Sequence, residues 1–180
     1  MRSPHVDARA LAPLARRIVA LSLVALAACT STSRPSASCT PPNGLATCVS
    51  VPSLTVTSRA FANGGRIPAA YTCDGGDHMP GLEWSAVPAS ARSIEVVVRD
   101  VDADYFVHYD RSGIPPNVRN LDRGTPRGSE QTNSFGMTRY RGPCPPKGST
   151  YHRYVFEVRA LDAHGGLVAL GTLVGTYARA

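Results

Sequence analysis

The sequence predicts a mainly β protein that folds as one domain. Its 180 residues include 16 glycines and 15 prolines, which argue against long helices because both residue types destabilise helix interiors. Several segments instead alternate apolar and polar residues with the period of two that is typical of strands, and turn-forming clusters separate them. After residue 30, the sequence shows no 3.6-residue apolar period that lasts more than two turns. A chain of this length has room for one compact domain with a terminal extension.

The first 28 residues are expected to form a signal peptide for export. Four arginines lie within the first 17 residues, and residues 18–28 (IVALSLVALAA) form an unbroken apolar run. The run is shorter than the roughly 20 residues that span a bilayer, but it fits the apolar core of a secretory signal. Residues 26–29 (LAAC) resemble a bacterial lipobox, which predicts cleavage before Cys29 and lipidation of its sulfur. An ordinary cleaved signal or an uncleaved anchor is the alternative.

Residues 29–52 are expected to form a tether that joins the lipid to a folded domain at residues 53–180. The segment is rich in Ser, Thr and Pro and lacks apolar periodicity, a composition typical of flexible chain. Lipidation predicts a location in the cell envelope, because two or three acyl chains hold a protein firmly on a membrane. Since Thr30 rather than an aspartate follows the cysteine, we expect the outer membrane, facing the periplasm, in a Gram-negative cell. In other cells we expect the outer face of the cytoplasmic membrane.

Four cysteines remain if Cys29 is lipidated, and an even number in an exported chain indicates disulfides. Four cysteines allow three pairings. We favour Cys39 with Cys48, because the loop between them is short and local, and then Cys73 with Cys144. The alternative is that some of the four remain free thiols.

Strand patterns occur in five segments of the expected domain. The longest, residues 151–161, places the even-numbered residues from His152 to Val158 on one face and three charged residues on the other. The charged face is expected to be wet, so His152 should point inward at the beginning of a strand, a position that suits a ligand pocket. A core histidine bonded to a backbone group is the alternative. The other segments are residues 54–58, 94–100, 105–112 and 167–177.

Six short motifs occur in a defined order along the expected domain. The series comprises residues 71–75 (YTCDG), 82–84 (LEW), 100–103 (DVDA), 106–109 (FVHY), 140–148 (YRGPCPPKG) and 152–156 (HRYVF). In this order the motifs resemble the phosphatidylethanolamine-binding protein family, and in particular its bacterial branch, which is often labelled Raf kinase inhibitor-like. The resemblance extends from about residue 54 to residue 179 and covers nearly all of the expected domain.

This resemblance implies a fold in which a large antiparallel β-sheet packs on a smaller sheet. It also implies a pocket near one end of the large sheet that binds phosphate and other small anions. The family's acidic residues, pocket histidines, proline-rich rim and aromatic residue match defined positions of this chain. The predicted ligand-binding residues are Asp100, Asp102, His108, Pro143, Pro145, Pro146, His152 and Tyr154.

The chemistry of these residue types suits an anion. Two imidazoles can donate N–H groups, and a nearby carboxylate would fix their tautomer and raise their pKa. A protonated imidazole would then form a charge-assisted hydrogen bond with the ligand. We expect Asp100 to orient His108 or His152, or to stabilise the rim, because an ionised carboxylate repels an anion. The loop rich in proline and glycine would supply a rigid rim with free backbone N–H groups.

The chain departs from the family's pattern in three respects. Val101 and Asp104 stand where the family has prolines, which should soften the loop and place a further negative charge near the anion. Tyr109 stands where the family has a tryptophan. Only residues 163–169 separate residues 160–162 (ALD) from the part of the chain that matches the family's final Gly-Thr-Tyr strand, so the family's helix before that strand should be missing. Its loss could open the pocket or expose apolar surface.

Together these observations predict an exported, lipid-anchored protein that binds a small anion, either phosphate or a phospholipid head group. One alternative is an inhibitor or interaction module for an exported partner protein such as a protease, and another is a hydrolase. We expect no enzymatic activity, because the motifs supply no activated nucleophile, and we expect no cofactor and no metal. We also expect no nucleic-acid partner, because the net charge of +6 forms no basic run beyond Arg16 and Arg17.

Overall fold

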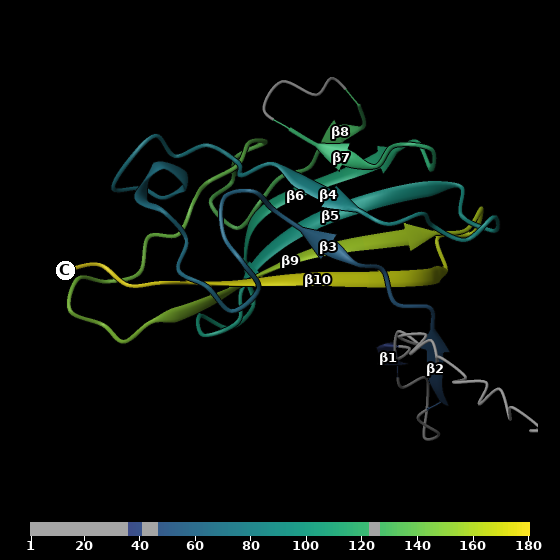
Figure 1. Ribbon diagram of the computed structural model, residues 1–180, viewed down its shortest axis with the longest axis horizontal. Coiled ribbons are helices and arrows are strands. Elements are labelled where there is room, and N and C mark those ends of the chain that lie inside the picture. Colours follow the sequence, from purple (N-terminus) through teal and green to yellow (C-terminus); the bar gives the residue numbers. More distant parts are fainter. Residues whose placement is uncertain (1–35, 41–46, 123–126) are drawn as a thin grey trace, which may run out of the picture. The chain divides into compact units, whose positions relative to one another are not determined.

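The folded domain consists of two antiparallel sheets that pack face to face (Figure 1). The computed structural model describes residues 36–40, 47–122 and 127–180. The large sheet has the order β10 (Leu167–Tyr177), β9 (His152–Leu161), β5 (Ser93–Asp100), β6 (Phe106–Ile114) and β8 (Ser129–Glu130). The small sheet has the order β3 (Val56–Thr57), β4 (Leu82–Trp84) and β7 (Asn120–Leu121). The predicted architecture, a large sheet packed on a smaller one, is therefore confirmed.

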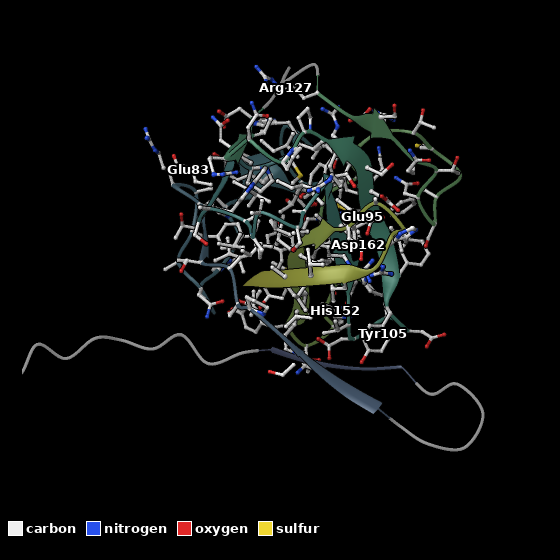
Figure 2. The ribbon with its side chains drawn as sticks, turned by 90° about the vertical axis from the view of Figure 1, so that its right-hand side faces the viewer. Glu83, Glu95, Tyr105, Arg127, His152 and Asp162 are labelled. Atoms are coloured by element: carbon white, nitrogen blue, oxygen red, sulfur yellow. A yellow bond between two sulfur atoms is a disulfide. The ribbon has the colours of Figure 1, made fainter. Side chains whose placement is uncertain are left out.

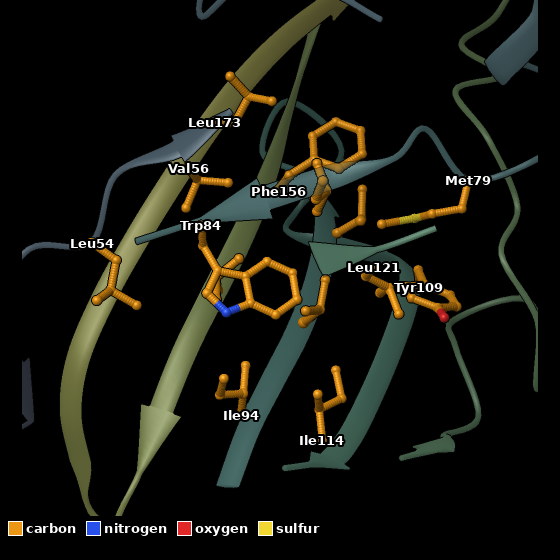
Figure 3. Close-up of a cluster of buried hydrophobic side chains, with 14 of the residues drawn as sticks. Leu54, Val56, Met79, Trp84, Ile94, Tyr109, Ile114, Leu121, Phe156 and Leu173 are labelled. Atoms are coloured by element: carbon orange, nitrogen blue, oxygen red, sulfur yellow. The ribbon is translucent and has the colours of Figure 1, made fainter. Parts of the chain in front are cut away.

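The core lies between the two sheets and consists of the alternating inward residues of each. Figure 3 shows Trp84 and Leu121 of the small sheet beside Ile94, Ile114 and Phe156 of the large one. Burying each such side chain stabilises the fold by about 1.5–3 kcal/mol. The indole N–H of Trp84 donates to the carbonyl of Val118 at 3.0 Å, so its polar atom is satisfied inside the core.

The predicted parity of β9 is confirmed. Tyr154, Phe156 and Val158 are buried and face the core, whereas Arg153 on the opposite face is exposed. The other charged residues of that face are half-buried rather than fully wet, because they pair with charges on β5. Arg159 lies 2.8 Å from Glu95 there.

A tight hairpin joins β9 to β10 in place of a helix. The Asp162 carboxylate accepts hydrogen bonds from the backbone N–H groups of His164 and Gly166, each at 2.8 Å. Gly165 adopts a φ of 80°, which glycine tolerates without strain. The described residues contain the short 3-10 helix η1 (Ala69–Tyr71), and no helix among them is long and apolar enough to cross a bilayer. Figure 2 views the domain from this hairpin end.

Two further strands lie within the segment for which we predicted only a tether. β1 (Ser36–Thr40) and β2 (Thr47–Val51) pair antiparallel, with Cys39 opposite Cys48. The β-branched residues of these strands favour extended backbone. The register brings the two cysteine backbones together as the predicted bond requires, and the bond itself stays a prediction. The predicted signal peptide and the lipidation site at Cys29 lie outside the described residues.

The chain enters the folded domain at the end opposite to the beginning of β9. The backbone N–H of Leu54 donates to the carbonyl of Leu170, near the beginning of β10. The far end of β10 pairs Tyr177 with His152. Seven residues of strand separate these points, a distance of about 23 Å. Any segment that precedes residue 53 therefore joins the domain far from His152.

A disulfide joins Cys73 to Cys144, as we predicted. The two cysteines lie 71 residues apart in the sequence, one just after η1 and the other in the proline-rich loop. The backbone N–H of Cys73 also donates to the carbonyl of Pro143 at 3.1 Å. The bond therefore fixes the proline-rich loop to a distant part of the chain.

Replacing both Cys73 and Cys144 by serine should lower the free energy of unfolding by about 4 kcal/mol. The estimate follows from the loop-closure entropy that a cross-link over this sequence separation removes from the unfolded chain. Equilibrium denaturation by urea, monitored by tryptophan fluorescence, measures the change. The double variant Cys39→Ser/Cys48→Ser serves as the control and should lose less, because its cysteines enclose a much shorter loop. A loss at 73 and 144 no larger than in this control would contradict the assignment.

Candidate functional site

A hydrogen bond between a buried carboxylate and an imidazole lies where β5 ends and β9 begins. Asp100 pairs with Tyr154 across the two strands, which brings its carboxylate to the ring of His152. The Nδ1 atom of His152 lies 2.8 Å from Oδ2 of Asp100, and Oδ1 of Asp100 accepts the backbone N–H of Asp102 at 3.0 Å. Asp100 is 3% exposed and the side chain of His152 is 15% exposed. The carboxylate thus orients the imidazole from inside and leaves Nε2 as its unbonded ring nitrogen.

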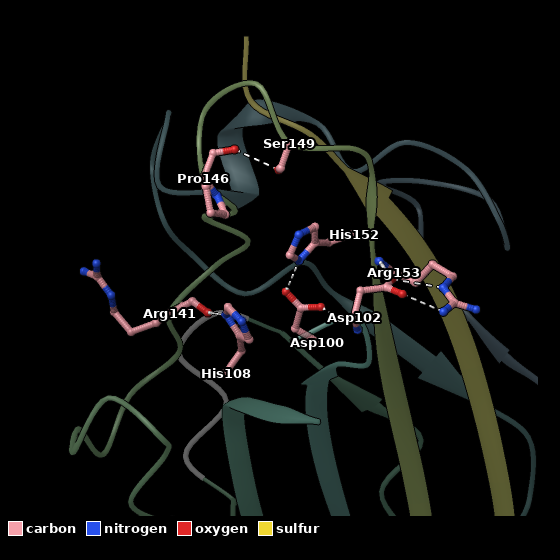
Figure 4. Close-up of polar contacts among 8 residues, drawn as sticks. All are labelled: Asp100, Asp102, His108, Arg141, Pro146, Ser149, His152 and Arg153. Carbon is pink, nitrogen blue, oxygen red and sulfur yellow. Dashed lines mark hydrogen bonds and ion pairs between the residues drawn. The ribbon is translucent and has the colours of Figure 1, made fainter. Parts of the chain in front are cut away.

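His108 lies on β6, and Asp100 lies between it and His152, as Figure 4 shows. Its Nδ1 atom is 2.7 Å from the carbonyl oxygen of Arg141. Because a carbonyl can only accept a hydrogen bond, Nδ1 carries the proton. His108 is 4% exposed, and this burial lowers its pKa despite the opposing effects of the Arg141 carbonyl and of Asp100. Our expectation that carboxylates raise the pKa of both histidines is therefore wrong for His108, where desolvation dominates.

Tyr154 contacts both histidines from β9. Its ring packs edge-on against His108 at 5.2 Å and stacks on His152 at 6.5 Å between centroids. The side chain is fully buried, and burial raises the pKa of its hydroxyl. Among the described residues this hydroxyl makes no hydrogen bond of full geometry, but the carboxylate of Asp100 and the backbone of Cys144 lie close enough to act on its pKa. The site therefore holds a buried hydroxyl beside a carboxylate and two imidazoles.

Asp102 is one of the predicted ligand-binding residues, but its carboxylate bonds to Arg153 instead of to the histidines. Oδ2 accepts the backbone N–H of Arg153 at 2.7 Å, and the guanidinium donates to both carboxylate oxygens at 2.6 and 3.0 Å. These hydrogen bonds lower the pKa of Asp102 to about 2. The structure brings Asp100, His108, His152 and Tyr154 together, whereas Asp102 anchors the β5–β6 turn to β9.

The proline-rich loop forms a wall beside His108. Pro143 and Pro145 are buried, whereas Pro146 is exposed and its carbonyl accepts the hydroxyl of Ser149 at 2.8 Å (Figure 4). The beginning of the loop is fixed by Asp77. The carboxylate of Asp77 accepts the backbone N–H of Gly142 at 2.6 Å. It also forms an ion pair with the guanidinium of Arg141, at 3.0 Å. The loop therefore presents the carbonyl that orients His108 from a fixed position.

Two aromatic residues outside the predicted set pack around His108. Phe135 lies 5.3 Å from its ring and Phe106 lies 5.6 Å from it, both edge-on. Phe135 is 38% exposed, and the guanidinium of Arg141 lies 5.7 Å from its ring centroid. No strand periodicity in the sequence links Phe135 to His108, because Phe135 lies in a turn outside the expected strands.

The buried side chain of Asn133 holds the turn that carries Phe135. Its amide oxygen accepts the backbone N–H groups of Phe135 and Met137. Its amide nitrogen donates to the carbonyls of His108 and Arg139, at 3.2 and 2.8 Å. Asn133 is buried, so one side chain holds the turn, β6 and the beginning of the proline-rich loop together.

The β5–β6 turn explains one departure from the family's pattern. Asp104 and Tyr105 adopt φ values of 53° and 56°, in the left-handed region that proline cannot enter and that aspartate tolerates better than most residues. A proline at position 104 is therefore incompatible with this turn. Tyr105 is 64% exposed and lies in the turn rather than in the strand that we predicted from residue 105.

Two cavities of about 340 Å³ lie elsewhere on the domain. One is lined by residues that include Arg59, Glu83 and Asn120, and the other by residues that include His78 and Arg139. None of the predicted ligand-binding residues lines either of them. Within the candidate site the side chain of His152 is 15% exposed, whereas His108 is 4% exposed.

Comparison with known proteins gives consistent results. The model of the phosphatidylethanolamine-binding protein family matches residues 57–177. A UPF0098 protein of Aquifex aeolicus is 41% identical over 117 residues, which are 61% of this chain and 68% of that protein. A UPF0098 protein of Methanothermobacter thermautotrophicus is 40% identical over 118 residues, with 61% and 77% covered.

Solved structures show the same fold. A structure from Chlamydia trachomatis, described as a homologue of phosphatidylethanolamine-binding protein, has a TM-score of 0.64 and 31% identity, covering 71% of this chain and 99% of that one. YbcL of Escherichia coli, described as a member of the mammalian family, has a TM-score of 0.66 and 26% identity with the same coverage. The predicted family and the mainly β fold are both confirmed.

Phe135→Ala should raise the pKa of His108 towards the ordinary histidine value of about 6.5. Burial is the main reason that the pKa lies below this value, and removal of the covering ring admits water. In the wild type the unfolded chain takes up this proton first, so stability falls as the pH drops below about 6.5. The variant should lose less stability over the same range.

Histidine ring resonances followed by nuclear magnetic resonance (NMR) between pH 4 and 8 measure the shift. Met137→Ala is the matched control, because Met137 is equally exposed at 38% and lies in the same turn. A His108 pKa that moves in the control but not in Phe135→Ala would show that Phe135 does not shield the imidazole.

Proposed function

Because this chain belongs to the phosphatidylethanolamine-binding protein family, we propose that it binds a small anion, phosphate or a phospholipid head group, at His152, Tyr154 and His108. One observation carries the proposal. The bond between His152 and Asp100 holds a partly exposed imidazole beside the ring of Tyr154, and the buried Tyr154 hydroxyl makes no hydrogen bond of full geometry among the described residues. Two potential donors thus lie together at the end of the large sheet.

The charges of the site favour an anion at this place. While Nδ1 of His152 bonds to Asp100, a proton on Nε2 would donate a charge-assisted hydrogen bond to an anion. Both oxygens of Asp100 already accept hydrogen bonds, from Asp102 and from His152, so the carboxylate need not face the ligand. Asp102 is likewise neutralised by Arg153. The carboxylates therefore orient the site and oppose the ligand less than their formal charges indicate.

Binding accounts for these residues without a chemical step. The sulfur of Cys144 is bonded to Cys73 and is not free to act as a nucleophile. Both imidazoles pack against the ring of Tyr154, and each can take part in hydrogen bonds with a ligand. We therefore propose a binding protein rather than an enzyme.

We further propose that the protein is exported and held in the cell envelope by a lipid on Cys29. The chain enters the domain beside Leu170, at the end opposite to His152. In the sequence, β1 and β2 lie between Cys29 and this end of the domain, and the length of the sheet separates that end from His152. The domain can then turn its site away from the membrane that anchors it, towards ligands in the surrounding space.

Titration with inorganic phosphate, followed by NMR, tests the proposed binding. The resonances of His152, Tyr154 and His108 should shift and saturate. His152→Gln should weaken binding at least tenfold, because it removes a charge-assisted hydrogen bond while its amide can still donate to Asp100. His164→Gln, in the exposed β9–β10 turn, is the matched control and should bind as the wild type does.

Two results would contradict the proposal. One is a titration in which the three resonances do not saturate at any accessible phosphate concentration. The other is equal affinity in His152→Gln and in the control. A parallel titration with phosphorylethanolamine shows whether a head group is preferred to the bare anion.

A further inference from the structure

We propose that the cavity lined by His78 and Arg139 is a second binding site, and that it takes a small carboxylate with an apolar body. The cavity measures about 340 Å³, which lies within the range of small-molecule sites. None of the predicted ligand-binding residues lines it. The proposal therefore goes beyond the proposed function and does not depend on anion binding at His152.

Part of the cavity lining is apolar and well packed. Met79, Leu121, Tyr109 and Tyr140 contribute to this part, and Figure 3 shows the first three near one another. Each of the four is at most 9% exposed. Because Tyr109 belongs to β6 and Leu121 to β7, both sheets contribute to the lining. A ligand with an apolar body would remove apolar surface from water against these side chains.

Two carboxylates of the lining are already paired with cations. Asp77 forms an ion pair with the guanidinium of Arg141 at 3.0 Å, and its other carboxylate oxygen accepts a backbone N–H at 2.6 Å. Glu130 lies 3.0 Å from the guanidinium of Arg111 and accepts the hydroxyl of Tyr109 at 3.1 Å. These partners offset both negative charges, so neither carboxylate repels an anionic ligand with its full charge.

The charge that remains available in the cavity is that of Arg139. Its guanidinium makes no ion pair and no hydrogen bond of full geometry with the described residues. The third lining carboxylate, Asp122, is exposed and accepts the side-chain amide of Asn120 at 3.3 Å, so water screens its charge. The guanidinium of Arg139 can donate two parallel hydrogen bonds to a planar carboxylate.

His78 supplies a second donor to the cavity. Its ring packs edge-on against Tyr71 at 5.2 Å between centroids. A Cβ added at Gly76 would lie 2.5 Å from Nδ1 of His78, so the glycine lets the imidazole lie close to the backbone. The imidazole carries at least one N–H in either protonation state. It can therefore donate to a carboxylate without a change of its own charge.

A carboxylate joined to an apolar body matches both parts of this lining. Its oxygens would accept hydrogen bonds from Arg139 and His78, and its body would contact Met79 and Leu121. A cationic ligand matches less well, because the lining carboxylates already have donor partners. An uncharged ligand would leave the guanidinium without a counter-charge.

Titration with benzoate, followed by NMR at pH 7, tests the proposal. The ring resonances of His78 and the methyl resonance of Met79 should shift and saturate. Benzamide has nearly the same shape but no charge, and it should bind at least tenfold more weakly because it loses the charge-assisted hydrogen bonds. Acetate keeps the charge but lacks the ring, and it should also bind at least tenfold more weakly.

Arg139→Gln is the diagnostic variant and should weaken benzoate binding at least tenfold. Arg59→Gln is the matched control, because it makes the same change of charge at an exposed arginine that lines the other cavity of about 340 Å³. The control should bind benzoate as the wild type does. Both side chains are exposed, so thermal unfolding of the two variants should match that of the wild type.

A parallel titration in saturating inorganic phosphate separates this cavity from the site at His152. Phosphate should leave the affinity for benzoate unchanged, because no predicted ligand-binding residue lines the cavity. Failure of phosphate to bind would contradict the proposed function, and the benzoate titration would still decide the proposal on the cavity.

Three results would overturn the proposal on the cavity. One is a benzoate titration without saturable shifts at His78, whether or not His152 responds. Another is equal affinity of Arg139→Gln and Arg59→Gln for benzoate. The third is equal affinity of the wild type for benzoate and benzamide.

Discussion

The hydrogen bond between Asp100 and His152 is the interaction on which the candidate site depends. It exists because β5 and β9 are neighbours in the sheet, in a register that brings the last residue of one strand beside the beginning of the other. A carboxylate that is 3% exposed is costly unless it is paired and hydrogen-bonded. Asp100 meets this requirement with an imidazole and a backbone N–H, and the imidazole is oriented in return.

His108 is held in a different way, and the difference gives the site its character. A carbonyl of the proline-rich loop orients this ring, and that loop is fixed to distant segments by a disulfide, an ion pair and the amide of Asn133. The imidazole of His152 therefore bonds to a carboxylate, whereas the imidazole of His108 bonds to a neutral carbonyl. For His108, where the orienting partner carries no charge, burial dominates and lowers the pKa.

Much of this architecture could be predicted from the sequence. The period of two in residues 151–161 placed Tyr154 and Phe156 in the core, and the ordered motifs identified the family and the three residues that gather around Asp100. The pairing of Cys73 with Cys144 followed once the short local loop was assigned to Cys39 and Cys48. These predictions succeeded because strand periodicity and motif order reflect burial directly.

Other features depend on contacts that no local pattern records. Arg153 forms hydrogen bonds with the carboxylate of Asp102, a residue that motif matching had placed with the ligand-binding residues. Phe135 covers His108 from a turn 27 residues further along the chain, and the low pKa of His108 results from that packing. The strands β1 and β2 lie in a segment whose Ser, Thr and Pro content predicted flexible chain, because composition does not report strand pairing.

A crystal structure of the protein soaked in phosphate tests the central claim most directly. The account predicts a phosphate whose oxygens lie within hydrogen-bond distance of Nε2 of His152 and of the Tyr154 hydroxyl, with a third oxygen facing Nε2 of His108. A phosphate bound only on surface arginines, with these three atoms unoccupied, would contradict it.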